Sequence, residues 1–189
     1  MELYILRGLV MRKAVAILLM LSAVCLCAFS VTAQGGMNLS ECKDSRVVSF
    51  INYLKTEEIL NTEFDYYAVN VDEDEDYYVA FHPADCDLSE SVILYFEPLM
   101  IEFFWYSDTY VTDETLIDAL WAINDFSDSY ANWATLSIDP YDGCLKASAV
   151  MTTEGIASYG VAVYDHLEMF IYLAEDGFGF VQDTIEGEK

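Results

Sequence analysis

The stretch "WATLSIDPYDGCLKASAVM", residues 133–151, decides the fold of this chain. Apolar side chains occupy every second position in both of its halves, which is the period of a half-buried β-strand. Between the halves, "DPYDG" supplies a proline for the first central position of a turn and a glycine for a positive φ. We therefore expect an antiparallel hairpin. Its buried face is predicted to carry Ala134, Leu136, Ile138, Leu145, Ala147 and Ala149.

The residues on either side of this hairpin have the period of an α-helix. An apolar stripe in "TDETLIDALWAINDF", residues 112–126, predicts one helix before the hairpin. Ser158 is predicted to cap another helix after it, and the acidic residues from Asp176 onward are expected to form a short tail. The predicted buried stripes are Leu116, Ala119, Leu120 and Ile123 in the first of these helices, and Val163, Leu167, Phe170 and Ile171 in the second.

The preceding part of the chain predicts a further helix and several strands. An apolar stripe of Val47, Phe50, Ile51 and Leu54 predicts a helix from about Ser45 to Leu60. The stretch "FDYYAVNVDEDEDYYVAF", residues 64–81, alternates on both sides of an acidic link and predicts a hairpin. The runs "VILYF" and "LMIEFFWY", residues 92–96 and 99–106, are apolar at nearly every position, which is typical of strands covered on both faces.

The order of these elements predicts the fold class. Helices and strands follow one another as α-β-β-β-α-β-β-α, with the strands in runs between the helices. Such an order is typical of an α+β fold, here an antiparallel sheet of about five strands with three helices. Aromatic and aliphatic residues recur from Phe50 to Phe180 and can fill one core, so we expect a single domain.

The first 33 residues are interpreted as a secretory signal. A basic "MRK" at Met11 precedes the apolar run "AVAILLMLSAVCLCAFS", and "VTA" at residues 31–33 offers small residues to a signal peptidase. Met11 is therefore a candidate for the true start. The alternative is an uncleaved membrane anchor over residues 14–31. Whether or not the signal is cleaved, residues 34–189 are expected to form one exported domain, periplasmic or secreted. If the signal is cleaved, we expect no membrane contact of this domain.

The chain is strongly acidic, with 33 Asp and Glu against 8 Lys and Arg and a formal net charge of −25. Nucleic acid and anionic lipid are excluded as partners, because both associations depend on basic residues that displace counterions. Basic partners, cations or solubility remain as explanations of the acidity.

The acidic link "DEDED" imitates the first half of a calcium-binding loop. Asp72, Asp74 and Asp76 have the required spacing, but Tyr77 and Pro83 stand where such a loop needs Gly and a bidentate Glu. We interpret the link as a solvated turn, and weak cation association is the alternative.

The histidines and cysteines predict neither a metal nor a cofactor. Three cysteines follow the signal: Cys42, Cys86 and Cys144. They allow one disulfide by any of three pairings, and no two of them have the spacing of metal ligands. His82 lies near Asp85, Cys86 and Asp87 in the sequence and is interpreted as a loop residue.

No catalytic residue is assigned. "GIASYG", residues 155–160, resembles a nucleophile elbow around Ser158 but is one residue too long for G-x-S-x-G. His166 lies about two helical turns further along, too far for a direct hydrogen bond to Ser158. The aromatic run "FFWY", residues 103–106, is explained by alternation across a strand rather than by a ligand.

The region around the hairpin resembles a known family. "INDFSDSYANWATLSIDPYDGCLKASAVMTTEGIAS", residues 123–158, contains a helix end with Asn124 and Phe126, a polar gap, a strand, a D-G turn, a second strand and G-small-x-S before a last helix. This succession is similar to the YbjN family, described as bacterial sensory transduction regulators with a fold like that of type III secretion chaperones. Ser127 stands where the family commonly has a second Asn, so the signature is incomplete. The similarity extends over about residues 116–170.

The resemblance implies a non-enzymatic role without catalytic residues or cofactors. Asn124 is then interpreted as bonding backbone groups at a helix end. We expect an exported protein-binding module, chaperone-like or regulatory and able to form a homodimer, which receives a partner along a strand edge or an apolar helix groove. A cation-responsive acidic protein that uses Asp72, Asp74 and Asp76 is the alternative. A small hydrolase built on Ser158 is a third hypothesis.

Overall fold

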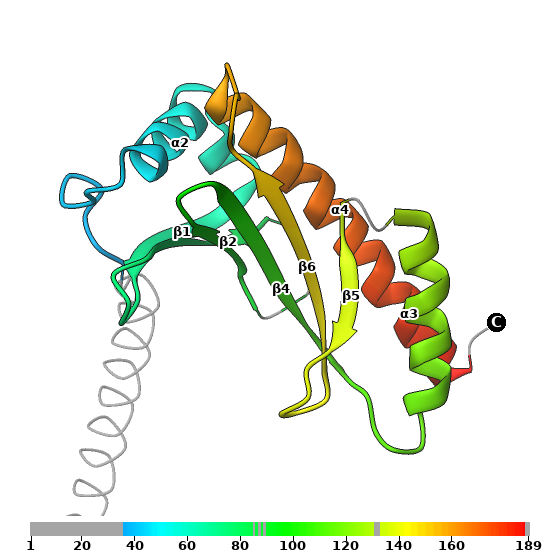
Figure 1. The fold of residues 1–189 in the computed structure, drawn as a ribbon. Helices are drawn as coiled ribbons and strands as arrows, with labels where there is room; N and C mark the ends of the chain where they lie inside the picture. The colour runs from blue at the N-terminus through cyan, green and yellow to red at the C-terminus, as the bar shows by residue number, and fades with distance from the viewer. Residues whose placement is uncertain (1–35, 85, 87, 89, 131–132, 188–189) are drawn as a thin grey trace, which may run out of the picture. The chain divides into compact units, whose positions relative to one another are not determined.

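A computed structural model describes residues 36–84, 86, 88, 90–130 and 133–187, so the predicted signal lies outside the described residues. Three helices and a six-stranded sheet make up the described chain (Figure 1). In chain order they are α2 (Ser45–Thr56), the 3-10 turn η1 (Ile59–Asn61), β1 (Phe64–Val71), β2 (Tyr77–Pro83), β3 (Val92–Phe96), β4 (Met100–Tyr110), α3 (Leu116–Tyr130), β5 (Thr135–Ile138), β6 (Cys144–Thr152) and α4 (Tyr159–Glu186). None of these helices is both long and apolar enough to span a membrane.

The predicted α+β class with an antiparallel sheet is confirmed. The sheet has the order β1-β2-β3-β4-β6-β5, and every neighbouring pair is antiparallel. It contains six strands rather than about five, because the runs "VILYF" and "LMIEFFWY" form two strands, β3 and β4, joined by a turn at residues 97–99. Four strands, not three, therefore precede α3.

Helix α2 forms where the sequence predicts it, and all four residues of its predicted stripe are fully buried. Asp44 caps its first turn, since the Asp44 carboxylate accepts a hydrogen bond of 2.8 Å from the backbone N–H of Arg46. The helix ends at Thr56 rather than near Leu60, because Glu58 takes a left-handed conformation with φ of 60° and leads into the turn η1.

Arg46 ties the start of α2 to the sheet. Its guanidinium forms an ion pair with Asp44 and donates hydrogen bonds to the carbonyl oxygens of Glu97 and Phe96, the latter at 2.7 Å. The hydrogen bonds to Asp44 raise the pKa of Arg46, although burial acts in the opposite direction. Burial favours a higher pKa for Asp44, but the hydrogen bonds and the positive charge of Arg46 lower it overall.

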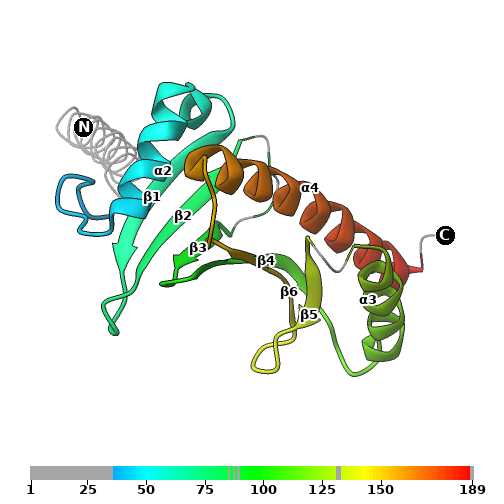
Figure 2. The same cartoon turned by 45° about the horizontal axis from the view of Figure 1, so that its top comes forward.

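The three described helices all pack on one face of the sheet, and we call the other face, which none of them covers, the open face (Figure 2). Alternation in β4 places Ile101, Phe103 and Trp105 in the core, fully buried. Phe104 and Tyr106 point to the opposite face, on which no described helix packs. The prediction that β3 and β4 are covered on both faces is therefore wrong, and neighbouring aromatic side chains shield one another on the open face instead.

The predicted hairpin is confirmed as β5 and β6, whose turn holds Gly143 at φ of 81°. The helices on either side of it differ from the prediction. Helix α3 buries Ala119, Ala122 and Phe126, so its buried stripe is shifted from the predicted one. Asn124 lies exposed inside this helix and not at its end, which overturns the interpretation of Asn124 as a capping residue.

Helix α4 is much longer than predicted and includes the acidic residues that were expected to form a tail. It continues through Asp176 to Glu186, because Phe178 and Val181 are buried and hold its second half against the rest of the core. Gly177 allows close packing there: a Cβ atom on it would lie 2.8 Å from Leu136 Cδ1 and 2.9 Å from Phe126 Cζ. The helix thus contacts α2, α3, β4 and β6.

Candidate functional site

The outer side of α3 carries the most concentrated group of exposed apolar side chains in the described chain. Ile117 and Trp121 are 69% and 68% exposed, Leu120 is 51% exposed and Leu116 is 39% exposed. We call these four residues the α3 patch. Positions three and four apart lie together on a helix surface, so Ile117, Leu120 and Trp121 form one continuous apolar area.

Acidic side chains flank the α3 patch. Asp113 and Glu114, just before α3, and Asp118, in its first turn, are all exposed at the end of the helix where its dipole favours negative charge. The surface thus combines a large apolar contact area with carboxylates at its edge. This combination suits a partner segment that is apolar on one side and basic at its margin.

Sequence reasoning missed Ile117 and Trp121. The signal was present, because Asp118 is the only polar residue between Leu116 and Ile123, and one buried stripe does not need so many apolar positions. The apolar side chains of this segment that do not belong to the buried stripe must therefore lie outside the core.

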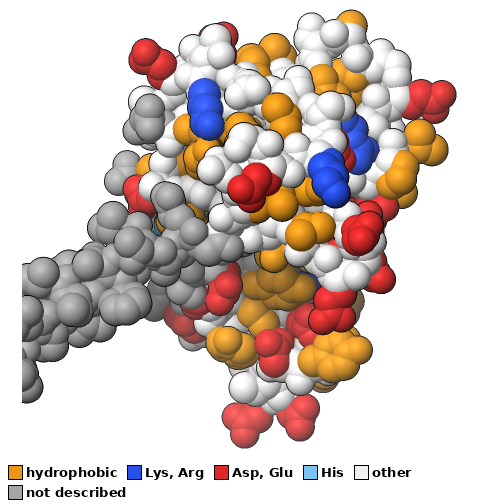
Figure 3. All heavy atoms as spheres, turned by 90° about the vertical axis from the view of Figure 1, so that its left-hand side faces the viewer, with side chains coloured by type: hydrophobic (Ala, Val, Ile, Leu, Met, Phe, Trp, Pro, Cys, Tyr) orange, Lys and Arg blue, Asp and Glu red, His pale blue; other side chains and the backbone are white. Residues whose placement is uncertain are grey.

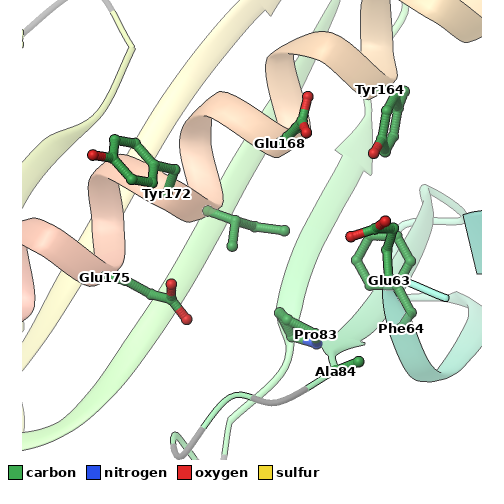
Figure 4. Close-up of a pocket in the computed structure, with 9 residues that line it drawn as sticks. Glu63, Phe64, Pro83, Ala84, Tyr164, Glu168, Tyr172 and Glu175 are labelled. Carbon is green, nitrogen blue, oxygen red and sulfur yellow. The ribbon is translucent and has the colours of Figure 1, made fainter.

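A second feature is a cavity of about 200 Å³ between α4 and the start of β1 (Figure 4). Its described lining includes no basic side chain and consists of Glu63, Phe64, Pro83, Ala84, Tyr164, Glu168, Ile171, Tyr172 and Glu175. Three carboxylates and two tyrosine rings can hold an amino or guanidinium group by charge and by contact with the ring faces.

The cavity affects the ionisation of Tyr164. Burial first, and then the negative charges of Glu168 and Glu63, raise the pKa of Tyr164 to about 12. The phenol is therefore neutral at physiological pH and can donate a hydrogen bond, while the negative charge of the cavity comes from the carboxylates.

The predicted cation residues lie in the turn between β1 and β2. The Asp72 carboxylate accepts hydrogen bonds from the backbone N–H groups of Asp74, at 3.0 Å, and Asp76, at 2.9 Å. One oxygen of the Asp72 carboxylate is thus used to accept hydrogen bonds from backbone N–H groups of the turn. Within the described chain no three His, Cys, Asp or Glu residues are grouped so that they could hold a metal ion. Cation binding at this turn stays a prediction.

Ser158 and His166 are not brought together. Ser158 is exposed at the start of α4, and its side chain makes no capping hydrogen bond there. The imidazole of His166 lies instead between the rings of Phe103 and Trp133, with centroids 4.9 and 5.1 Å away. Burial lowers the pKa of His166, and its Nε2 atom has no hydrogen-bond partner among the described residues.

The cysteines and His82 occupy separate places. Cys42 and Cys144 have free thiols, and the Cys144 thiol donates to the carbonyl of Ser107 at 2.8 Å. The Cys86 sulfur accepts from the backbone N–H of Leu88. The interpretation of His82 as a loop residue is wrong: it lies in β2, paired with Tyr66 of β1, and its ring stacks on that of Tyr66 with a centroid distance of 5.3 Å. Asp85 and Asp87, its predicted neighbours, lie outside the described residues.

Comparisons of the chain with known proteins found no match. No protein-family model, no curated protein and no solved structure matches the chain.

Proposed function

We propose that this chain is an exported, non-enzymatic protein-binding module, chaperone-like or regulatory, which holds an apolar and basic segment of a partner protein on the α3 patch. The observation that carries the proposal is the exposure of four adjacent apolar side chains on one helix. Large exposed apolar areas on folded proteins commonly mark interaction surfaces.

The composition of the α3 patch supports a protein partner. Trp121 offers the kind of large, exposed aromatic side chain that dominates protein interfaces, and Ile117 and Leu120 extend the contact area around it. The flanking Asp113, Glu114 and Asp118 add a negative margin in a chain of net charge −25. A basic partner is therefore attracted over a distance before the apolar contact forms.

The domain family is part of this proposal. The described order of helix, four strands, helix, hairpin and helix agrees with the order implied by the resemblance to the YbjN family, apart from one additional strand before α3. The proposed export, to the periplasm or the medium, rests on the signal-like sequence of residues 1–33. The non-enzymatic part rests on the separation of Ser158 from His166, which packs between two aromatic rings.

Site-specific photo-crosslinking in a bacterial host that exports the full chain tests the proposal. A photoreactive phenylalanine analogue is placed at position 121 in one variant and at position 141 in another. Tyr141 is the matched control, because it is also aromatic and is 96% exposed but lies in the β5–β6 turn. We expect a discrete protein adduct from position 121 and not from position 141. Equal adduct patterns at both positions, or none at position 121, would contradict the proposal.

A further inference from the structure

The open face of the sheet has a regular pattern across all six strands. The strand registers place six uncharged residues in one row that crosses the sheet from β1 to β5: Ala68, Ala80, Ile93, Phe104, Ser148 and Thr135. Two further rows lie on either side of this central row, one containing Glu102 and the other containing Lys146.

The flanking rows are rich in aromatic rings. Tyr78 and Tyr95 share the row of Glu102, with ring centroids 5.1 Å apart. Tyr106 is the direct neighbour of Lys146 in the other row, and the Lys146 ammonium lies 4.2 Å from the ring centroid of Phe104 and 5.3 Å from that of Tyr106. The cation therefore leans from β6 over β4, toward the middle of the face.

Glu102 and Lys146 are the only charged residues in the three rows, although the chain has a net charge of −25. They lie in different rows, about 13 Å apart along the strand direction at about 3.3 Å per residue. Among the described residues, Arg46 and Asp44 form an ion pair, whereas Glu102 and Lys146 take part in none. Neither charge is thus held in an ion pair by another described residue.

We propose that a second copy of the chain packs on this face in a two-fold symmetric dimer. A two-fold axis that lies between the two sheets and follows the central row exchanges the two flanking rows. Glu102 of one copy then lies over Tyr106 of the other, beside the ammonium of Lys146, and the reciprocal pair forms on the far side of the axis. Such an interface is self-complementary, as two-fold symmetry requires, and the strands of the two sheets are aligned, as in common sheet-on-sheet packing.

Charge and area both favour a second copy as the occupant. Two molecules of net charge −25 repel each other, but these three rows carry one charge of each sign, so two copies that meet on them bring no like charges into direct contact within the rows. Six strands about 4.8 Å apart and three rows of side chains about 6.6 Å apart give roughly 500 Å² of projected area. Side-chain relief adds to this value, which approaches the roughly 800 Å² per partner of a standard interface.

Reversal of the two charges tests the dimer. The exported full chain is studied by sedimentation equilibrium over a concentration series. Glu102→Lys and Lys146→Glu each place like charges opposite each other twice, so each is expected to weaken the dimer at least about tenfold. The double variant Glu102→Lys/Lys146→Glu restores both pairs and the dimer. Asp183→Lys, an exposed substitution on α4 with the same change of charge as Glu102→Lys, is expected to leave the dimer intact.

An equimolar mixture of the two single variants provides an internal control for folding. In a heterodimer of Glu102→Lys with Lys146→Glu both pairs are again of opposite sign, so the mixture is expected to dimerise although each variant alone does not. A wild-type chain that stays monomeric, or single variants that dimerise as well as wild type, would overturn the proposal. A mixture that remains monomeric, although circular dichroism shows that both variants are folded, would overturn it as well.

Discussion

The long C-terminal helix contains two glycines whose replacement by alanine has opposite expected effects. Gly177 lies where α4 meets α3 and β5, and Gly179 lies on the same helix with nothing within 4 Å of its added Cβ atom. Alanine at an open position in a helix is favoured over glycine by about 1 kcal/mol. Gly179→Ala should therefore stabilise the protein by about 1 kcal/mol.

At Gly177 the same gain is offset by overpacking. The added Cβ atom would lie 2.8 Å from Leu136 Cδ1 and 2.9 Å from Phe126 Cζ, and both side chains are buried, at 3% and 6% exposure. Overpacking of a filled core costs about 1–3 kcal/mol. The expected result for Gly177→Ala is a loss of about 0–2 kcal/mol, so the two variants should differ by about 1–3 kcal/mol.

Urea unfolding followed by circular dichroism measures both variants against the wild type. Leu136→Val removes the Cδ1 atom that the new methyl group contacts, so it should cost less in the Gly177→Ala background than in the wild type. Equal stabilisation by Gly177→Ala and Gly179→Ala would refute the close packing of α4 against α3 and β5. Loss of stability at both positions would refute a continuous helix to Glu186.

Three further predictions concern single polar groups. Arg46→Ala should destabilise the protein by about 2 kcal/mol in urea unfolding, because Asp44 and two backbone carbonyls lose their hydrogen-bond donor. Arg46→Lys should retain part of the lost stability. An unchanged urea midpoint for Arg46→Ala would contradict the role of Arg46 in tying α2 to the sheet. Because burial lowers the pKa of His166 in the folded chain, the unfolded chain binds a proton at this residue more readily. The free energy of unfolding should therefore have its full value above pH 6.5 and fall as the pH decreases below it. Urea unfolding at several pH values should show a smaller fall for His166→Phe than for the wild type, and identical pH profiles would contradict this prediction. Asp72→Ala should lower the free energy of unfolding by about 1 kcal/mol, and Asp72→Asn, which keeps an acceptor oxygen, should lower it by less. Calorimetry with calcium on the same variants tests the alternative function as a cation-responsive protein, which requires a heat of binding that Asp72→Asn reduces.

The parts of the fold that the sequence predicts well are those set by local pattern. The stripe of Val47, Phe50, Ile51 and Leu54 has one apolar face only, so its burial could be read directly. The hairpin of β5 and β6 likewise combines alternation with a turn that needs Gly143. In both cases one assignment of the buried face satisfies the pattern.

The remaining features depend on tertiary packing. Helix α3 is apolar on more than one side, so the position of α4 decides that Ala119 and Ala122 are buried while Leu120 is exposed. The apolar runs of β3 and β4 have the same pattern whether or not a second layer covers them. Gly177 and Gly179 lower helix propensity near Asp176, but burial of Phe178 and Val181 outweighs that local preference. The α3 patch was missed for the same reason, since exposure is a property of the assembled fold.

The binding affinity of a partner captured at position 121 is the most direct measure of the proposed function. Ile117→Glu, in the middle of the α3 patch, is compared with Tyr141→Glu, an equally charged substitution at an exposed side chain elsewhere. A buried contact at the centre of an interface is worth about 2 kcal/mol or more, so Ile117→Glu should weaken binding by at least about tenfold, and Tyr141→Glu should leave it unchanged. Equal affinities for the two variants would show that the partner binds elsewhere and would contradict the role assigned to α3.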